Sequence, residues 1–309
     1  MSFTTSHRVL LALSTLACAC QARADLVWDV VPGTTQTTHV QVQCVPMNSD
    51  GPTGTGQAEP GVLVLHPRPS SNGVENTECD SFISLQYERL PPEPDVQISH
   101  PVIHMQSGGT GSCQDMHLAF EMACTVEHVP LWGTSVIDVD VKVGPWVRQL
   151  PDATWRVFDF NLEGDDRYYQ QAFHVMPQAT LGLSYPAQMG IIRGSSSPLS
   201  VTVYNNGPSG NDNVELAVAF PTMDFMPSIP QSLAGLCTVD ITEGVTLQCG
   251  PFRIDPGQWK TIETQVHAAS DTPLGLHDVH VNVSAALGPA KQGEFSIQVH
   301  QPYGTADRR

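Results

Sequence analysis

An acidic stretch near the middle of the chain places oxygen ligands at the alternate positions that a calcium loop uses. Its candidate ligands are Asp159, Asn161, Glu163 and Asp165. Calcium takes roughly six to eight oxygens, and the helix-loop-helix form of the site closes with a bidentate glutamate at its twelfth position. That position is Gln170 here. A hairpin is the competing interpretation, with these side chains on the solvated face of a strand that turns at Gly164.

A second group of residues has the ligand types that copper prefers. It comprises His100, His104, Met105 and His117. Imidazole and thioether donors suit copper, and His100 and His104 would share one face of a strand because side chains alternate there. Histidines also serve as ordinary polar residues on exposed strand faces. Metal binding, of copper here or of calcium at the acidic stretch, is the alternative function.

Six cysteines remain once an apolar leader is set aside: Cys44, Cys79, Cys113, Cys124, Cys237 and Cys249. An even number is typical of an oxidising compartment, where thiols pair. None of them forms the C-x-x-C motif that is typical of zinc sites. The third and fourth enclose ten residues and the fifth and sixth enclose eleven, which favours two local pairs and leaves the first two for each other. The sequence by itself does not fix this connectivity.

A polar loop in the second half offers hydrogen-bonding side chains to a partner. Its candidate residues are Asn205, Asn206, Asn211, Asp212 and Asn213. Binding surfaces are commonly built on loops at the end of a sandwich. Asn and Gly also tolerate left-handed backbone angles, so turn formation alone explains these residues.

Three tryptophans can be interpreted either as a binding surface or as core residues. Trp132, Trp146 and Trp155 could together make a surface on which a sugar stacks. Large aromatic side chains are also major components of protein cores. The sequence favours burial of these three residues, with sugar stacking as the alternative.

No motif commits the chain to catalysis. It contains no G-x-S-x-G elbow, no H-E-x-x-H pair and no glycine-rich phosphate loop. Paired acids such as Asp138 and Asp140 fall on the polar face of an alternating strand, where solvation explains them. We therefore expect neither an enzyme nor a bound cofactor. An enzyme would need a cleft formed between two domains.

The charge of the chain restricts its partners. Its formal net charge is −17, from 14 basic and 31 acidic residues. Nucleic acids and anionic lipid surfaces both select basic proteins. A protein or a glycan is therefore the expected partner, and nucleic acid is not.

The N-terminal residues resemble a secretory signal. Arg8 precedes an uncharged apolar run, and Ala22 and Ala24 are small residues where a signal peptidase reads them. The predicted mature chain begins at Asp25. Its net charge is −19, because the leader removes Arg8 and Arg23 and no acidic residue.

A lipid anchor on Cys18 or Cys20 is the alternative fate of this leader. Leu16 lies one place too close to Cys18 for a good lipobox, which favours the soluble signal peptide. Both interpretations predict export to the periplasm, the cell surface or the medium. No later segment reaches the roughly 20 apolar residues that a membrane-spanning helix needs.

Apolar residues alternate with polar ones from end to end of the chain. Between Ser135 and Val143, for example, every second residue is valine or isoleucine. Period-two alternation predicts strands with one buried face, and helical patterns are nearly absent. With 25 glycines and 25 prolines to form turns, the pattern predicts an all-β protein of two tandem immunoglobulin-like antiparallel β-sandwiches.

The length of 309 residues suggests two domains. The predicted organisation is a signal peptide at 1–24, a first sandwich at 25–145, a connecting hairpin or linker at 146–177, a second sandwich at 178–301 and a flexible tail at 302–309. A weak internal repeat supports two units, since Gly133 and Gly257 each follow a local cysteine pair and lead into a strand. Upstream, the repeat aligns Val62 to Gly73 with Val201 to Asn213.

The second half resembles a known family. Val201 to Ser209 reads VTVYNNGPS, a strand and turn similar to the conserved repeat domain of unknown function found in bacterial surface and exported proteins. The match continues through Val214 to Pro221, then Cys237, Cys249 and Asp255-Pro256-Gly257, and covers about residues 178 to 290. The resemblance implies an immunoglobulin-like, non-catalytic domain in a bacterial envelope. The first half departs from it, with His66 to Ser70 where the Asn-Asn-Gly-Pro turn is expected.

These observations predict a non-enzymatic exported protein of the cell envelope. Two disulfide-bonded sandwiches would present their loops to a protein or glycan partner. The alternative is a periplasmic or secreted protein that binds copper or calcium.

Overall fold

The computed structural model describes residues 26–46, 61–67, 77–87, 96–116, 121–159 and 166–302. The predicted signal peptide, including Cys18 and Cys20, lies outside the described residues, as do residues 303–309 of the predicted tail. Within the described part of the chain, no helix has the length and apolar character needed to cross a membrane.

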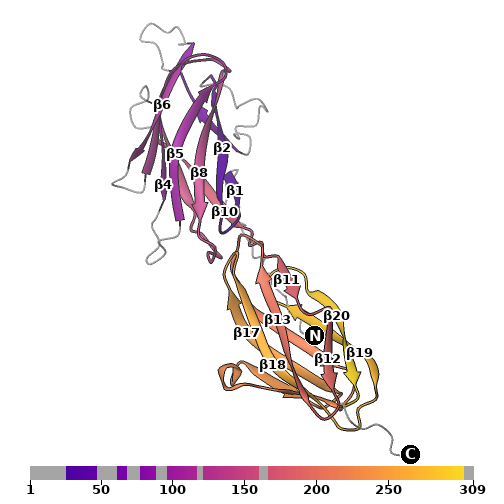
Figure 1. The fold of residues 1–309 in the computed structure, drawn as a ribbon. Helices are drawn as coiled ribbons and strands as arrows, with labels where there is room; N and C mark the ends of the chain where they lie inside the picture. Colours follow the sequence, from indigo (N-terminus) through magenta and orange to yellow (C-terminus); the bar gives the residue numbers. More distant parts are fainter. Residues whose placement is uncertain are drawn as a thin grey trace, which may run out of the picture.

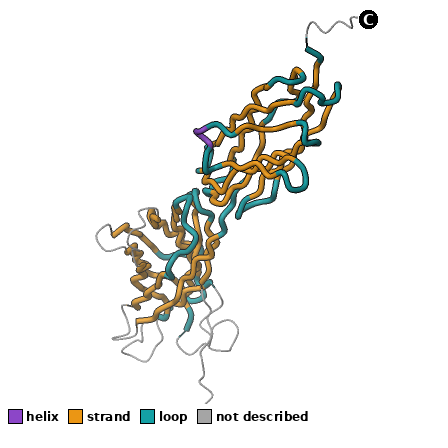
Figure 2. Tube along the Cα trace, turned by 90° about the horizontal axis from the view of Figure 1, so that it is seen from below, coloured by secondary structure: helices purple, strands orange, loops and turns teal. Residues whose placement is uncertain are grey.

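The described residues form twenty β-strands and one short 3-10 helix, Gln231–Leu233. The strands of the first half are β1 Leu26–Val30, β2 Thr35–Cys44, β3 Val62–Leu65, β4 Glu78–Tyr87, β5 Val96–Met105, β6 Thr110–Met116, β7 Glu121–Pro130, β8 Thr134–Val143, β9 Ala153–Asp159 and β10 Asp166–Val175. Those of the second half are β11 Leu181–Ser184, β12 Gln188–Ile192, β13 Ser196–Asn205, β14 Asn211–Phe220, β15 Phe225–Ser228, β16 Cys237–Asp240, β17 Val245–Ile254, β18 Trp259–Ala268, β19 Gly275–Ser284 and β20 Lys291–His300. Figure 2 shows strand and loop almost throughout, which confirms the all-β class.

The strands of the described chain form four sheets, paired into two sandwiches. The first sandwich combines a six-stranded sheet, β1-β10-β9-β4-β7-β6, with a four-stranded sheet, β3-β2-β8-β5. The second combines β12-β20-β19-β14-β17-β16 with β11-β13-β18-β15. Each has its own hydrophobic core, and Figure 1 shows the two sandwiches end to end.

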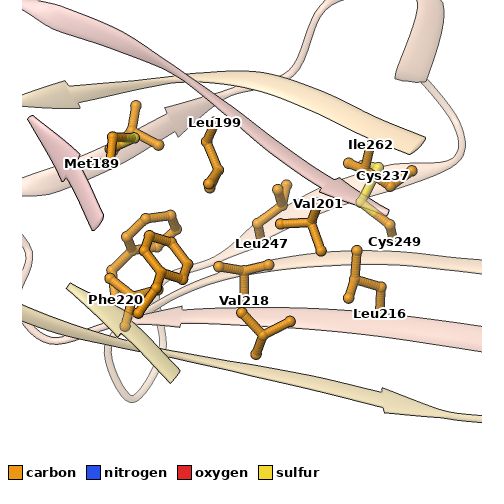
Figure 3. Packing of buried hydrophobic residues seen from close by; sticks show 14 of the residues in the cluster. Met189, Leu199, Val201, Leu216, Val218, Phe220, Cys237, Leu247, Cys249 and Ile262 are labelled. Carbon is orange, nitrogen blue, oxygen red and sulfur yellow. A yellow bond between two sulfur atoms is a disulfide. The ribbon is translucent and has the colours of Figure 1, made fainter. Parts of the chain in front are cut away.

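Alternation of side chains places the cores. In β8, Ile137, Val139 and Val141 are fully buried, while Asp138 and Asp140 between them face outward. Burying one aliphatic side chain of this size contributes about 1.5–3 kcal/mol. Figure 3 shows the same arrangement in the second sandwich, where side chains from both sheets, among them Val201 and Leu247, meet between the layers.

The two sandwiches share one strand order in their six-stranded sheets. Each opens with a strand that pairs in parallel with the last strand of its sandwich, β1 with β10 and β12 with β20. The remaining order, β9-β4-β7-β6, corresponds strand for strand to β19-β14-β17-β16. In the smaller sheets, β2, β8 and β5 correspond to β13, β18 and β15. Only the outer strand differs, because β3 pairs with β2 in parallel whereas β11 pairs with β13 antiparallel.

This correspondence changes the alignment of the repeat. The repeat read from the sequence aligned the region from Val62 with the region from Val201, which lies in β13. In the structure the counterpart of β13 is β2, which ends at Cys44. Val62 begins β3, which pairs parallel with β2. His66, which follows β3, therefore does not stand in the place of the Asn-Asn-Gly-Pro turn, and residues 68–70 of that segment lie outside the described residues.

The sequence predicted that residues 146–177 connect the two sandwiches, and the structure shows a different role for them. Two strands form there as a hairpin, β9 paired with β10. However, β9 also pairs with β4 along its length, and β10 pairs with β1. Trp155 and Val157 on β9 are fully buried in the first core. The hairpin is thus part of the first sandwich rather than a linker.

Candidate functional site

The six cysteines form three disulfides, in the pairing expected from the sequence. They are Cys44–Cys79, Cys113–Cys124 and Cys237–Cys249. The last two occupy corresponding positions, each joining directly opposite residues of an edge strand and its neighbour, β6 with β7 and β16 with β17. Cys44–Cys79 instead links β2 of one sheet to β4 of the other, and both of its residues are fully buried.

The polar loop of the second half is divided between interior and surface. Asn205 is fully buried: its amide donates to the Ser209 carbonyl at 2.8 Å and its Oδ1 accepts from the Gly207 N–H at 3.0 Å. Asn211 is also buried and donates to the Leu287 carbonyl at 2.8 Å. Asn206, Asp212 and Asn213 are exposed. A role of these five residues in partner binding stays a prediction.

This loop packs against the first sandwich. The Ser209 hydroxyl donates to the Pro32 carbonyl at 2.9 Å, and the Gly210 N–H donates to the Pro145 carbonyl at 2.9 Å. A Cβ added at Gly33 would overlap the Pro208 carbonyl. The two backbones thus approach so closely that only glycine fits at position 33, where the φ of 87° also favours glycine.

Trp146 is the central side chain of this joint, which we define as residues 32–33, 145–148, 208–210 and 253–255. Its Nε1–H donates to the Asp255 carboxylate at 2.8 Å. The Arg253 guanidinium lies 3.3 Å from the centre of its ring, a close cation–π contact. From the first sandwich, Arg148 donates to the Gly210 carbonyl at 2.8 Å. Side chains and backbone from both sandwiches therefore hold their ends together.

The structure assigns a different environment to each tryptophan expected to share one role. Trp155 is fully buried and its indole N–H donates to Gln171 at 3.3 Å. Trp146 belongs to the joint. Trp132 is 50% exposed at the turn between β7 and β8, at the opposite end of the first sandwich. The expected burial is therefore confirmed for Trp155 and wrong for Trp132, and the three residues do not form one sugar-stacking surface.

Most of the metal candidates lie beyond what the structure describes. Asn161, Glu163, Asp165 and His117 lie outside the described residues, and the side chains of His100 and Asp159 are also not described. Met105 is partly buried beside the first core, whereas His104 is exposed. In the part of the chain that the structure describes, no group of three His, Cys, Asp or Glu side chains could hold a metal ion.

His104 instead belongs to a hydrogen-bonded group that the sequence did not reveal. The Asp138 carboxylate on β8 accepts from His39 Nδ1 on β2 at 2.7 Å and from His104 Nε2 on β5 at 3.0 Å. The two imidazoles bond different oxygens of the carboxylate. His39 and Asp138 are direct cross-strand neighbours, a relation that becomes visible only once the strand register is known.

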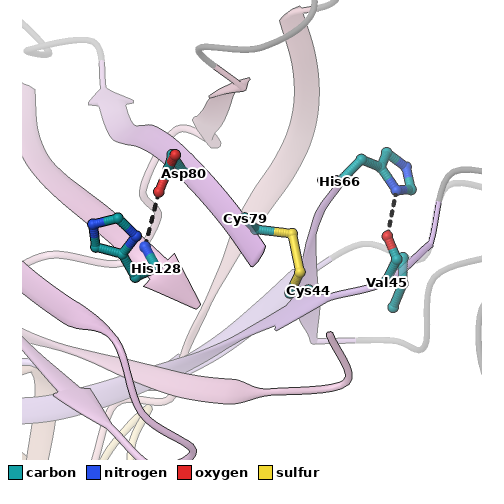
Figure 4. The surroundings of a disulfide bond; sticks show 6 residues. All are labelled: Cys44, Val45, His66, Cys79, Asp80 and His128. Atoms are coloured by element: carbon teal, nitrogen blue, oxygen red, sulfur yellow. Dashed lines mark hydrogen bonds between the residues drawn. A yellow bond between two sulfur atoms is a disulfide. The ribbon is translucent and has the colours of Figure 1, made fainter. Parts of the chain in front are cut away.

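A further acidic group surrounds His128 near the Cys44–Cys79 disulfide (Figure 4). The His128 backbone N–H donates to Asp80 at 2.8 Å, and its Nδ1 donates to Glu78 at 2.9 Å. The hydrogen bond to Glu78, followed by the negative charges of Glu78, Asp80 and Glu127, raises the pKa of His128 above its ordinary value. The backbone of His128 is left-handed, with a φ of 57°.

Trp259 was also missed by reasoning from the sequence. It is the first residue of β18, it is 65% exposed, and it lies directly opposite Tyr204 of β13. The alternation of β18, which buries Ile262, Thr264 and Val266, places residues 259, 261 and 263 on the outer face. That pattern could have identified Trp259 as an exposed aromatic residue.

Comparison with known proteins finds likeness in fold alone. No family model and no curated protein matches the chain. The titin domains z1z2, solved in complex with telethonin, are 12% identical over 90% of this chain and 94% of theirs, with a TM-score of 0.35. The seventh ScaB type I cohesin from Pseudobacteroides cellulosolvens is 10% identical over 42% of this chain and 97% of its own, with a TM-score of 0.30.

A family 123 glycoside hydrolase from Clostridium perfringens is 14% identical over 40% of this chain, with a TM-score of 0.29. This chain spans only 27% of that protein. None of these likenesses carries a function to this chain. The β-sandwich fold expected from the family resemblance is present, whereas membership of the bacterial repeat family stays a prediction.

Proposed function

We propose that this protein is a non-enzymatic, exported module of the cell envelope that binds a protein or glycan partner. The joint around Trp146 is the observation that carries the proposal. It fixes two sandwiches end to end, so that surfaces on both are held at a set spacing. Such an arrangement suits a binding or spacing element.

Export is supported by the chemistry of the cysteines. All six cysteines after the leader are paired, and disulfides persist in oxidising compartments outside the cytoplasm. Cys44–Cys79 cross-links two sheets through a buried bond. A stable extracytoplasmic scaffold is the function that fits this construction.

Co-sedimentation of the mature protein, beginning at Asp25, with envelope fractions of its own host tests the proposal. We expect saturable binding to at least one fraction. Protease treatment of the fraction abolishes binding if the partner is a protein, and periodate oxidation abolishes it if the partner is a glycan. Absence of saturable binding to every fraction contradicts the proposed function.

A further inference from the structure

The outer face of the β11-β13-β18-β15 sheet, here called the Trp259 face, has a different composition from the other outer sheet faces. Its outward residues are Gly182, Ser184, Ser196, Pro198, Ser200, Thr202, Tyr204, Met226, Ser228, Trp259, Thr261, Glu263, Gln265 and His267. Only one of them is an acid, in a chain of net charge −17. The outer face of the six-stranded sheet in the same sandwich, by contrast, carries Glu215, Asp278 and Glu294.

The strand register places the residues of this face in rows. Tyr204 lies opposite Trp259, Thr202 opposite Thr261, and Ser200 opposite Glu263. The hydroxyls of Thr202 and Thr261 are 2.9 Å apart. Because successive rows are two residues apart, the three rows span about 13 Å, which is longer than one sugar ring.

The first row is aromatic. A Cβ added at Gly182 would overlap the ring of Tyr204, so that ring lies across β11 in the space that Gly182 leaves open. Packing of this kind stabilises a glycine in an edge strand, and it leaves Tyr204 partly buried. Trp259, which is 65% exposed, is the ring available to a ligand.

From this arrangement we propose that the Trp259 face binds a neutral oligosaccharide. The proposal rests on the function proposed above and names the class of partner. A sugar ring presents a face of C–H groups, which packs on an aromatic ring, and a rim of hydroxyls, which pair with hydroxyl and carboxylate groups. Trp259 supplies the ring, and Thr202, Thr261 and Glu263 supply the hydrogen-bonding groups in the following rows. The near absence of charge matches a neutral glycan, whereas a basic protein partner would select the acidic faces.

Isothermal titration calorimetry on the mature protein tests this proposal with soluble neutral hexasaccharides: cellohexaose, mannohexaose, maltohexaose and chitohexaose. We expect at least one to bind and Trp259→Ala to weaken that binding by about tenfold or more, as loss of a central aromatic contact does. Trp259→Phe should recover part of the affinity because a ring remains.

Trp132→Ala is the matched control, since Trp132 is a similarly exposed tryptophan on the other sandwich. It should leave the affinity unchanged. Circular dichroism and urea unfolding of each variant establish that the fold is retained. If none of the four sugars binds the wild-type protein, or if Trp259→Ala binds as tightly as wild type, the proposal is overturned.

Two further measurements separate this face from other occupants. Light scattering coupled to size exclusion overturns the proposal if it detects a dimer that Trp259→Ala dissociates, because the face would then bind a second copy. An acidic oligogalacturonate that binds as tightly as the neutral sugars also overturns it. If the wild type binds none of the sugars and Trp259→Ala still binds envelope fractions, sugar binding by the Trp259 face is refuted. The proposed function is then unaffected.

Discussion

At the scale of single residues, similar side chains have unlike roles because their surroundings differ. Asn205 and Asn206 are adjacent in a turn that the sequence treats as one polar loop, yet the first is buried and the second exposed. Asn205 joins the Ser209 carbonyl and the N–H groups of Thr180 and Gly207. It therefore organises the turn from inside.

Replacing Asn205 with alanine should destabilise the second sandwich. The substitution leaves buried backbone groups without partners, and the free energy of unfolding should fall by roughly 2–4 kcal/mol. Urea denaturation followed by fluorescence measures this difference. Asn206→Ala is the control and should change stability by less than about 0.5 kcal/mol. Equal effects of the two changes contradict the structural role of Asn205.

His128 gives the first sandwich a pH dependence of known sign. Its pKa is raised in the folded state by the hydrogen bond to Glu78 and by nearby negative charges. The stabilisation is therefore fully present below the unfolded pKa, about 6.5, and is lost as the pH rises through the higher folded value. His128→Asn keeps a residue that tolerates the left-handed backbone but does not titrate.

The wild type should exceed His128→Asn in stability by more at pH 5 than at pH 9, measured by chemical denaturation at both values. An NMR titration of the His128 ring should give a midpoint above 6.5, since the folded pKa is raised. A stability difference that is the same at both pH values would count against this assignment.

At the scale of strands and cross-links, the disulfides connect different kinds of neighbours. Cys237–Cys249 joins neighbouring strands of one sheet and closes a loop of 12 residues. Cys44–Cys79 joins the two sheets of the first sandwich across a separation of 35 residues. The chain-entropy model assigns about 3 kcal/mol to the shorter loop and about 4 kcal/mol to the longer.

Replacing Cys44 and Cys79 together with alanine should therefore lower the stability of the first sandwich. The decrease should exceed the decrease in the second sandwich when Cys237 and Cys249 are both replaced with alanine. Loss of contacts between the sheets adds to the entropic difference, because both Cys44 and Cys79 are fully buried. Differential scanning calorimetry of the two double variants measures the transition of each sandwich. A larger loss of stability in the double variant of Cys237 and Cys249 would contradict this prediction. It would mean that the edge of the second sandwich depends on its disulfide more than the packing indicates.

At the scale of the whole molecule, the joint determines how the two sandwiches are held. Arg253 and Asp255 of the second sandwich both contact Trp146 of the first. The Ser209 hydroxyl and the Gly210 N–H each donate to a backbone carbonyl across the same joint. Trp146 makes the side-chain contacts that are easiest to remove without altering either core.

Trp146→Ala should loosen the arrangement of the sandwiches while preserving the fold of each. Small-angle X-ray scattering should detect a broader distribution of interatomic distances than in the wild type, because the cation–π contact and the hydrogen bond to Asp255 are lost. Trp132→Ala, far from the joint, should scatter as the wild type does. Identical scattering by wild type and Trp146→Ala would show that the remaining contacts, including those of Arg148 and Ser209, maintain the joint without Trp146.

The sequence by itself determined the all-β class, the alternation that buries each strand on one face, and the closely spaced cysteine pairs. These are local properties: period two follows from strand geometry, and a short cysteine spacing restricts the loop that closes. The strand order and the membership of β9 and β10 in the first sandwich were decided by tertiary structure, because the sequence does not state which strands become neighbours.

The candidate sites divide in the same way. The alternation of β18 already places Trp259 outward, but its row with Tyr204 depends on the cross-strand register. The joint unites Trp146 with Asp255, which are 109 residues apart, and the Asp138 group unites three strands. Such contacts arise from chain segments far apart in sequence, and only the folded chain brings them within hydrogen-bonding distance.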